Sequence, residues 1–168
     1  DSSVLLSGLD GSGREFLARK IHFESNRNNK RFKVIDFSDS DRTKIENQLF
    51  GSEEKGIIKS VGILGEVNGG SLFVKNIDKM NSKIQGKFLR VLEEKKYYRL
   101  GSVSPNNIDF RLISSSKMFL NNLKKCKTFR NDLLNKINFF EITVPSIKQR
   151  TEDIDDLVKE FLSSSLNF

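Results

Sequence analysis

Short apolar segments alternate with longer segments of helical period along the whole chain. Residues 71–74 form a continuous apolar run, which is typical of a parallel strand covered on both faces. Residues 31–37 instead alternate between polar and apolar side chains, as a half-buried strand does. The same reasoning predicts further strands over residues 3–7, 97–100, 108–114 and 138–144, the last ended by Pro145.

Helix signals fill the intervals between these strands. The clearest helix is predicted over residues 81–94, where Asn81 is a candidate N-cap and the apolar positions form one stripe. Those positions are Ile84, Phe88, Leu89, Val91 and Leu92. Further helices are predicted over residues 15–24, 42–49, 63–67, 118–124, 129–136 and 152–163, and residues 51–62 are predicted to be a loop. Repeated strand–helix units predict an α/β fold with a mostly parallel sheet, helices on both faces and ligands at the carboxyl ends of the strands.

Composition narrows the class of protein. A chain of 168 residues with 36% hydrophobic and 30% charged residues is typical of one soluble domain, residues 1–168. The single cysteine, Cys126, excludes an internal disulfide framework and indicates a cytoplasmic location, where we expect an ordinary thiol. No apolar run approaches the ~20 residues that cross a bilayer. The net charge of +7 is spread along the chain, which favours a basic solvated surface over a nucleic-acid arm.

One turn has the pattern of a phosphate-binding loop. The strand at residues 3–7 is followed by Gly8 to Glu15, and Gly8 and Gly13 have the four-residue gap of the P-loop. Glycines let backbone N–H groups converge on an anion, and a helix N-terminus adds partial positive charge. The candidate nucleotide-binding residues are therefore Gly8, Asp10, Gly11, Ser12, Gly13, Arg14 and Glu15.

Position 14 departs from the P-loop pattern, in which this residue is lysine. Arg14 keeps the charge, but its forked guanidinium is not equivalent to an ammonium at a phosphate site. Two interpretations stay open: a loop that binds an anion or nucleotide, and a turn that no longer binds one.

The order of these landmarks resembles the AAA+ central domain of sigma-54-dependent transcriptional activators, the bacterial enhancer-binding proteins. The resemblance covers nearly the whole chain. It is carried by residues 8–15, 18–22, 47–51, 69–73, 85–94, 98–101, 129–134, 144–145 and 150–154. It implies a three-layer P-loop NTPase fold of which residues 152–168 begin the lid, with most of the lid missing.

The activity that the resemblance implies is ATP hydrolysis in a ring, which remodels the polymerase bound to sigma-54. Such chemistry needs a lysine on the phosphates, a carboxylate that holds Mg²⁺, a second carboxylate that polarises water, and an arginine from a neighbouring subunit. Glu15 agrees with the family pattern. The two Walker B acids, however, correspond to Lys75 and Asn76, which makes this part of the site three charges more positive than the pattern.

Further family positions also differ. The sensor position corresponds to Lys117, and the polymerase-contacting GAFTGA loop is replaced by a shorter segment over residues 54–61. Of two expected arginines, Arg130 is retained as a candidate trans finger, although a surface salt bridge is the simpler role, and the second corresponds to Lys136. Lys75 has two interpretations as well: a cation that replaces Mg²⁺ against phosphates, or an ion pair with Asp10 or Asp78.

The main hypothesis is a degenerate nucleotide-binding or oligomerisation module of a bacterial transcriptional regulator, with weak or no ATP hydrolysis. ATP or ADP is its expected ligand, Mg²⁺ is not expected, and no catalytic residue or metal ligand is assigned. Sigma-54 RNA polymerase and further copies of the chain are its candidate partners, with DNA contacted only through segments outside this chain. One alternative is an active ATPase with relocated acids such as Asp78; the other is a basic protein- or DNA-interaction module.

Overall fold

The computed structural model describes residues 2–38, 41–153 and 159. Its central sheet has the order β2-β5-β8-β1-β9, and every neighbouring pair is parallel. Its strands are β1 (Val4–Ser7), β2 (Phe32–Asp36), β5 (Ser71–Lys75), β8 (Arg111–Ser116) and β9 (Phe140–Thr143). From β1 the chain crosses to β2 and returns through β5 and β8, and β9 then adds on the other side of β1. The strand order therefore reverses at β1, where α/β sheets place their ligands.

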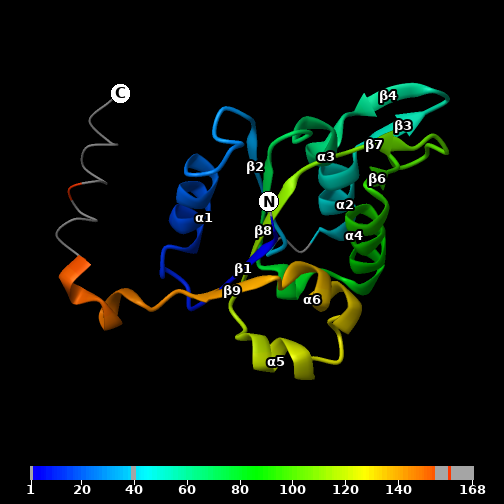
Figure 1. The fold of residues 1–168 in the computed structure, drawn as a ribbon. Helices are drawn as coiled ribbons and strands as arrows, with labels where there is room; N and C mark the ends of the chain where they lie inside the picture. Colours follow the sequence, from blue (N-terminus) through cyan, green and yellow to red (C-terminus); the bar gives the residue numbers. More distant parts are fainter. Residues whose placement is uncertain (1, 39–40, 154–158, 160–168) are drawn as a thin grey trace.

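Helices cover both faces of this sheet, as the sequence predicts (Figure 1). On one face α1 (Arg14–Phe23) packs Ala18 against Leu6, Phe73 and Ile113. On the other face lie α2 (Arg42–Phe50), α3 (Gly62–Glu66) and α4 (Ser82–Glu94). The predicted cap and stripe of α4 are confirmed: the Asn81 side chain accepts from the Ile84 N–H at 3.0 Å, and the apolar positions are buried.

Short elements complete the chain. They are the helices α5 (Leu120–Lys125) and α6 (Asn131–Ile137) and the 3₁₀ turns at Ile77–Lys79, Ile147–Gln149 and Thr151–Asp153. The predicted helix over residues 152–163 lies largely outside the described residues.

Two predictions near residues 51–100 are wrong. Residues 51–62 are not a loop, because β3 (Ser52–Glu54) and β4 (Ile57–Ser60) pair as an antiparallel hairpin. The turn between them places Lys55 at φ 50° and Gly56 at φ 79°, a left-handed pair that fits the twist of a hairpin. The usual sequence signal for such a hairpin turn is Asn-Gly. This chain has Lys-Gly instead, so the hairpin was not predicted from the sequence. The strand predicted over residues 97–100 is also displaced: β6 (Lys96–Tyr97) pairs with β7 (Asn106–Asn107) in a second small hairpin.

Candidate functional site

The glycine loop lies between the carboxyl ends of β1 and β8. The Gly8 N–H donates to the Ser116 carbonyl at 3.2 Å, which ties the start of the loop to β8. A Cβ at Gly8 would stand 2.6 Å from the Val144 carbonyl oxygen, so any larger residue would have to push the chain after β9 away. Gly13, at φ 86°, turns the chain directly into α1. The sequence therefore builds this turn by glycine at positions where a side chain does not fit.

A cleft of about 390 Å³ opens beside this loop, and we call it the glycine-loop cleft. It brings together most of the predicted site residues, because residues 10–15, Lys75 and Asn76 all line it, together with Lys117. The charged residues of the lining balance: the cations are Arg14, Lys75 and Lys117, and the acids are Asp10, Glu15 and Asp36. Lys75 and Asn76 in place of the two Walker B acids suggest an excess of positive charge. The acids of the lining neutralise that excess within the cleft.

Asp10 holds two of these cations. Arg14 Nη2 lies 3.2 Å from one carboxylate oxygen of Asp10, and Lys117 Nζ donates to the other. The hydrogen bond from Lys117 is the main cause of a lowered pKa at Asp10, whose side chain is 67% exposed. Arg14 is only 11% exposed, and its Nη1 is buried with no partner among the described residues. An incoming anion could supply that missing acceptor.

Lys75 lies between two carboxylates. Its Nζ stands 3.0 Å from Glu15 Oε2 and 3.5 Å from Asp36 Oδ2, so the predicted pairing with Asp10 or Asp78 is wrong. The hydrogen bond to Glu15 raises the pKa of Lys75. Burial acts to raise the pKa of Glu15, but hydrogen bonds from Arg19 and Lys75 outweigh it and lower that pKa. Both partners are therefore charged at neutral pH.

Asn76 brings a further carboxylate into the site. It adopts a left-handed conformation at φ 53°, and its Nδ2 donates to Asp36 Oδ1 at 2.7 Å. Asp36 ends β2 and stands opposite Lys75 in the β2–β5 register. Burial acts to raise the pKa of Asp36, but hydrogen bonds from Asn76 and Ser38 outweigh it and lower that pKa. Sequence reasoning missed Asp36, for which the available signal was an acid near the end of the strand predicted over residues 31–37.

These residues fit a phosphate group but not Mg²⁺. Arg14 Nη1 and Ser12 Oγ are buried and lack partners among the described residues, which suits an anion in the loop. The structure shows no cluster of three or more His, Cys, Asp or Glu side chains suited to a metal within the part of the chain that it describes. Instead, the Lys75 ammonium stands between the two carboxylates that could offer oxygen ligands.

A second residue that sequence reasoning missed as a site residue is Arg150, which the sequence marks only as part of the family resemblance. Its Nη2 donates to the Ser12 carbonyl at 2.6 Å, and its Nη1 reaches Asp153 at 3.3 Å. Arg150 thus fixes the outer turn of the loop from the segment after β9.

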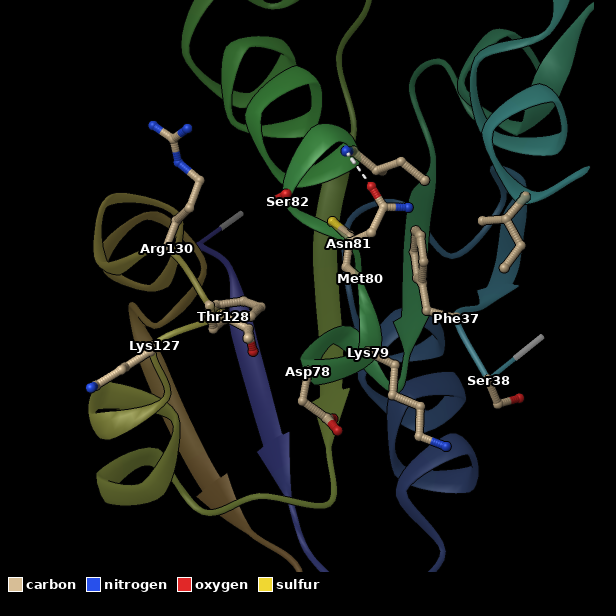
Figure 2. Close-up of a pocket in the computed structure, with 13 residues that line it drawn as sticks. Phe37, Ser38, Asp78, Lys79, Met80, Asn81, Ser82, Lys127, Thr128 and Arg130 are labelled. Carbon is tan, nitrogen blue, oxygen red and sulfur yellow. Dashed lines mark hydrogen bonds between the residues drawn. The ribbon is translucent and has the colours of Figure 1, made fainter. Parts of the chain in front are cut away.

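Asp78 and Arg130 line a different cleft, of about 750 Å³, at the start of α4 (Figure 2). Asp78 is not among the residues that line the glycine-loop cleft. Figure 2 shows the Asp78 and Arg130 side chains pointing in opposite directions. Arg130 Nε and Nη2 donate to Asp132 at 3.0 and 2.6 Å, and these bonds hold the pKa of Asp132 at about 2. In this structure Arg130 forms the surface salt bridge that was the simpler interpretation.

Comparison with known proteins agrees with this architecture. Residues 1–143 match the family model described as the sigma-54 interaction domain. Among curated relatives, the nitrogen assimilation regulatory protein NtrX of Azorhizobium caulinodans is 38% identical over 163 residues, which are 96% of this chain and 36% of that protein. The DNA-binding transcriptional regulator NtrC of Proteus hauseri is 35% identical over 168 residues, 97% of this chain and 35% of that protein.

A solved structure gives the same result for the fold. The crystal structure of NtrX from Brucella abortus in complex with ADP superposes with a TM-score of 0.86 at 33% identity, covering 97% of this chain and 36% of that one. This chain therefore spans about a third of the length of these NtrC and NtrX relatives. The parallel α/β sheet with its glycine loop is the P-loop AAA+ fold, as the sequence predicts. The chain belongs to the family of sigma-54 interaction domains.

Proposed function

We propose that this domain is a nucleotide-binding and oligomerisation module of a bacterial transcriptional regulator that hydrolyses ATP weakly or not at all. Its relatives are transcriptional regulators, and the crystal structure of one of them, NtrX of Brucella abortus, is a complex with ADP. The observation that carries the proposal is the position of Lys75, whose ammonium stands between Glu15 and Asp36 at the end of β5.

The chemistry of phosphoryl transfer explains why an ammonium at this position should prevent hydrolysis. Hydrolysis uses a metal ion against the phosphates and a carboxylate that accepts a proton from water. The Lys75 ammonium can donate hydrogen bonds to phosphate but cannot coordinate a metal, and the Asn76 amide cannot accept the proton. Losing both groups removes electrostatic and proton-transfer stabilisation of roughly 3 kcal/mol or more each.

Binding of phosphate remains feasible with this chain's own groups. The backbone of the loop and the start of α1 favour an anion. Arg14 can offer its unpartnered Nη1 to a phosphate, whereas Lys117 would have to leave Asp10, which is exposed enough to turn away into solvent. We therefore expect weak nucleotide binding that does not require Mg²⁺.

The proposed partners are sigma-54 RNA polymerase and further copies of the chain, as in the family. The β3–β4 hairpin stands where the family places its polymerase-contacting loop, and it exposes Ile57 (62%) and Ile58 (50%). Any polymerase contact at this hairpin would use these side chains in place of the family motif. We expect a cytoplasmic location from the transcriptional role. Separately, no described helix is long and apolar enough to cross a membrane.

Titration of ATP and ADP with and without Mg²⁺, combined with a phosphate-release assay, tests this proposal. We expect binding that is similar with EDTA and with Mg²⁺, lost in Arg14→Ala, and no release above background. Lys125→Ala, an exposed substitution on α5, is the matched control. Turnover that depends on Mg²⁺ and disappears in Arg14→Ala would show a working ATPase instead.

A working ATPase is the second candidate, and Asp36 is the observation that favours it. This carboxylate lies in the glycine-loop cleft, 2.7 Å from the Asn76 amide, and could accept a proton from water. If turnover is seen, Asp36→Asn should abolish it while nucleotide binding persists. An unchanged rate in that variant would exclude Asp36 as the base.

A further inference from the structure

A third cleft, of about 270 Å³, lies at the base of the two hairpins, and we call it the basic cleft. Its lining residues come in part from the end of α4 and from β6, and these elements lie away from the glycine loop, toward the other end of the sheet (Figure 1). No carboxylate belongs to its lining within the described chain. Its lining contains four cations, Lys87, Arg90, Lys96 and Arg99, and the aromatic side chain of Tyr98.

Acids outside the lining hold three of its four cations in place. Arg90 Nε donates to Glu94 at 2.6 Å, and Lys87 Nζ donates to Glu46 at 2.6 Å. Arg99 Nη1 lies 3.7 Å from Glu53. Each acid engages its cation from outside the lining, so no carboxylate competes with a ligand inside the cleft.

Two of the cations are not fully engaged by the described protein groups. Arg99 is 13% exposed, and its Nε is buried with no hydrogen-bond partner in the described chain. Lys96 is an exposed member of the lining, and no ion pair to it is found among the described residues. Buried guanidinium N–H groups are normally satisfied, and where every charged residue of the lining is a cation the fitting acceptor is an anion.

An aromatic side chain accompanies these cations. The Arg90 guanidinium carbon lies 5.6 Å from the ring centroid of Tyr98, and both side chains line the cleft. Tyr98 is half-buried, so part of its ring remains open to a ligand, whereas Tyr97 and Phe50 are buried. Cations beside an accessible ring suit a phosphate that carries a planar base, since bases stack on aromatic rings and on arginine.

We propose that the basic cleft binds single-stranded nucleic acid. The phosphate lies against Lys96, Arg90 and Arg99, and the base stacks beside Tyr98. The small volume admits a single extruded nucleotide rather than the groove of a duplex. An acidic peptide could meet the same cations, but its carboxylates would leave the aromatic ring without a role. This site is separate from the glycine-loop cleft and does not depend on the function proposed for it.

The test is fluorescence anisotropy of a labelled oligo(dT) with the whole chain at increasing salt. We expect binding that weakens with salt, and Lys96→Ala should reduce the slope of log K against log salt by about 0.7. Tyr98→Leu should weaken binding about fivefold or more, whereas Tyr98→Phe should not. The control Lys125→Ala should leave affinity and slope unchanged, and melting curves should show that all variants are folded.

Three outcomes would overturn the proposal. The first is no binding at 50 mM salt, and the second is an equal loss in Lys96→Ala and Lys125→Ala. The third is binding of poly-glutamate that is as tight as binding of oligo(dT) and equally indifferent to Tyr98→Leu, which would assign the cleft to an acidic peptide. The Arg14→Ala variant, which should lose nucleotide, is expected to bind oligo(dT) normally, so the two proposals fail separately.

Discussion

The glycine-loop cleft and the basic cleft both contain several cations with acidic partners, yet they offer different surfaces to a ligand. In the glycine-loop cleft the acids belong to the lining and meet the cations across the space that a ligand would fill. In the basic cleft the acids stand outside the lining. The number of cations in a cleft therefore does not decide whether it attracts an anion; the position of the carboxylates does.

This difference also shows why the net charge of the chain does not predict the charge of its nucleotide site. The chain carries +7 overall, and the exchange of acids for Lys75 and Asn76 suggests a cationic nucleotide site. The structure instead neutralises that site from two directions, with Glu15 from α1 and Asp36 from β2. Changing the charge of a single side chain in the glycine-loop cleft should therefore alter that cleft and leave the basic cleft unchanged.

The largest effect is expected from Lys75→Asp. This change removes the ammonium and adds a carboxylate beside Glu15 and Asp36, which creates a group of three acids able to hold a divalent cation. At a metal concentration 100 times the dissociation constant, the stabilisation would be about 3 kcal/mol, a rise in Tm of roughly 5 to 10 °C. Thermal unfolding with 0 to 10 mM MgCl₂ or MnCl₂ measures it.

The control for this experiment is Lys125→Asp, which makes the same charge change on α5. It should show no response to metal, as should the unchanged chain. A folded Lys75→Asp variant whose Tm ignores both metals would show that Glu15 and Asp36 do not converge on Lys75.

A smaller effect is expected from Asp10→Asn. The change releases Arg14 and Lys117 from their shared carboxylate and gives the glycine-loop cleft a net positive lining. We expect inorganic pyrophosphate, added with EDTA, to bind about 3- to 10-fold more tightly, and oligo(dT) binding to stay the same. Isothermal titration at low salt measures the first effect, with Asp109→Asn as the control. Weaker pyrophosphate binding would mean that Asp10 positions the cations rather than sequestering them.

How much the sequence could predict depends on how local each feature is. The turn at residues 8–13 and the Asn81 cap involve neighbours within a few positions, and their residue types were sufficient. Lys75 and Glu15 are 60 positions apart, and their contact depends on where α1 crosses the end of β5. Asp36 was hidden for the same reason, because only the parallel register of β2 and β5 places it opposite Lys75.

The smallest effect concerns pH. The lowered pKa values of Glu15 and Asp36 mean that their pairs with Lys75 stabilise the fold above about pH 4, where the unfolded carboxyls ionise. This contribution is lost as pH falls through the lowered values of the folded state. The raised pKa of Lys75 preserves the pairs on the alkaline side to beyond about pH 10. Lys75→Met should therefore reduce stability at neutral pH and make little difference in acid.

The expected loss is at most about 1 kcal/mol, because each of the three side chains is about one-third exposed and solvent screens the pairs. Urea unfolding of Lys75→Met and the unchanged chain between pH 3 and pH 8 measures the difference, with Lys125→Met as the control. Since the two carboxylates repel each other once the ammonium is gone, added MgCl₂ should restore part of the loss at pH 7 and none at pH 3. If the difference in the free energy of unfolding between Lys75→Met and the unchanged chain is the same at every pH in this range, Lys75 contributes through packing and not as the counter-ion of Glu15 and Asp36.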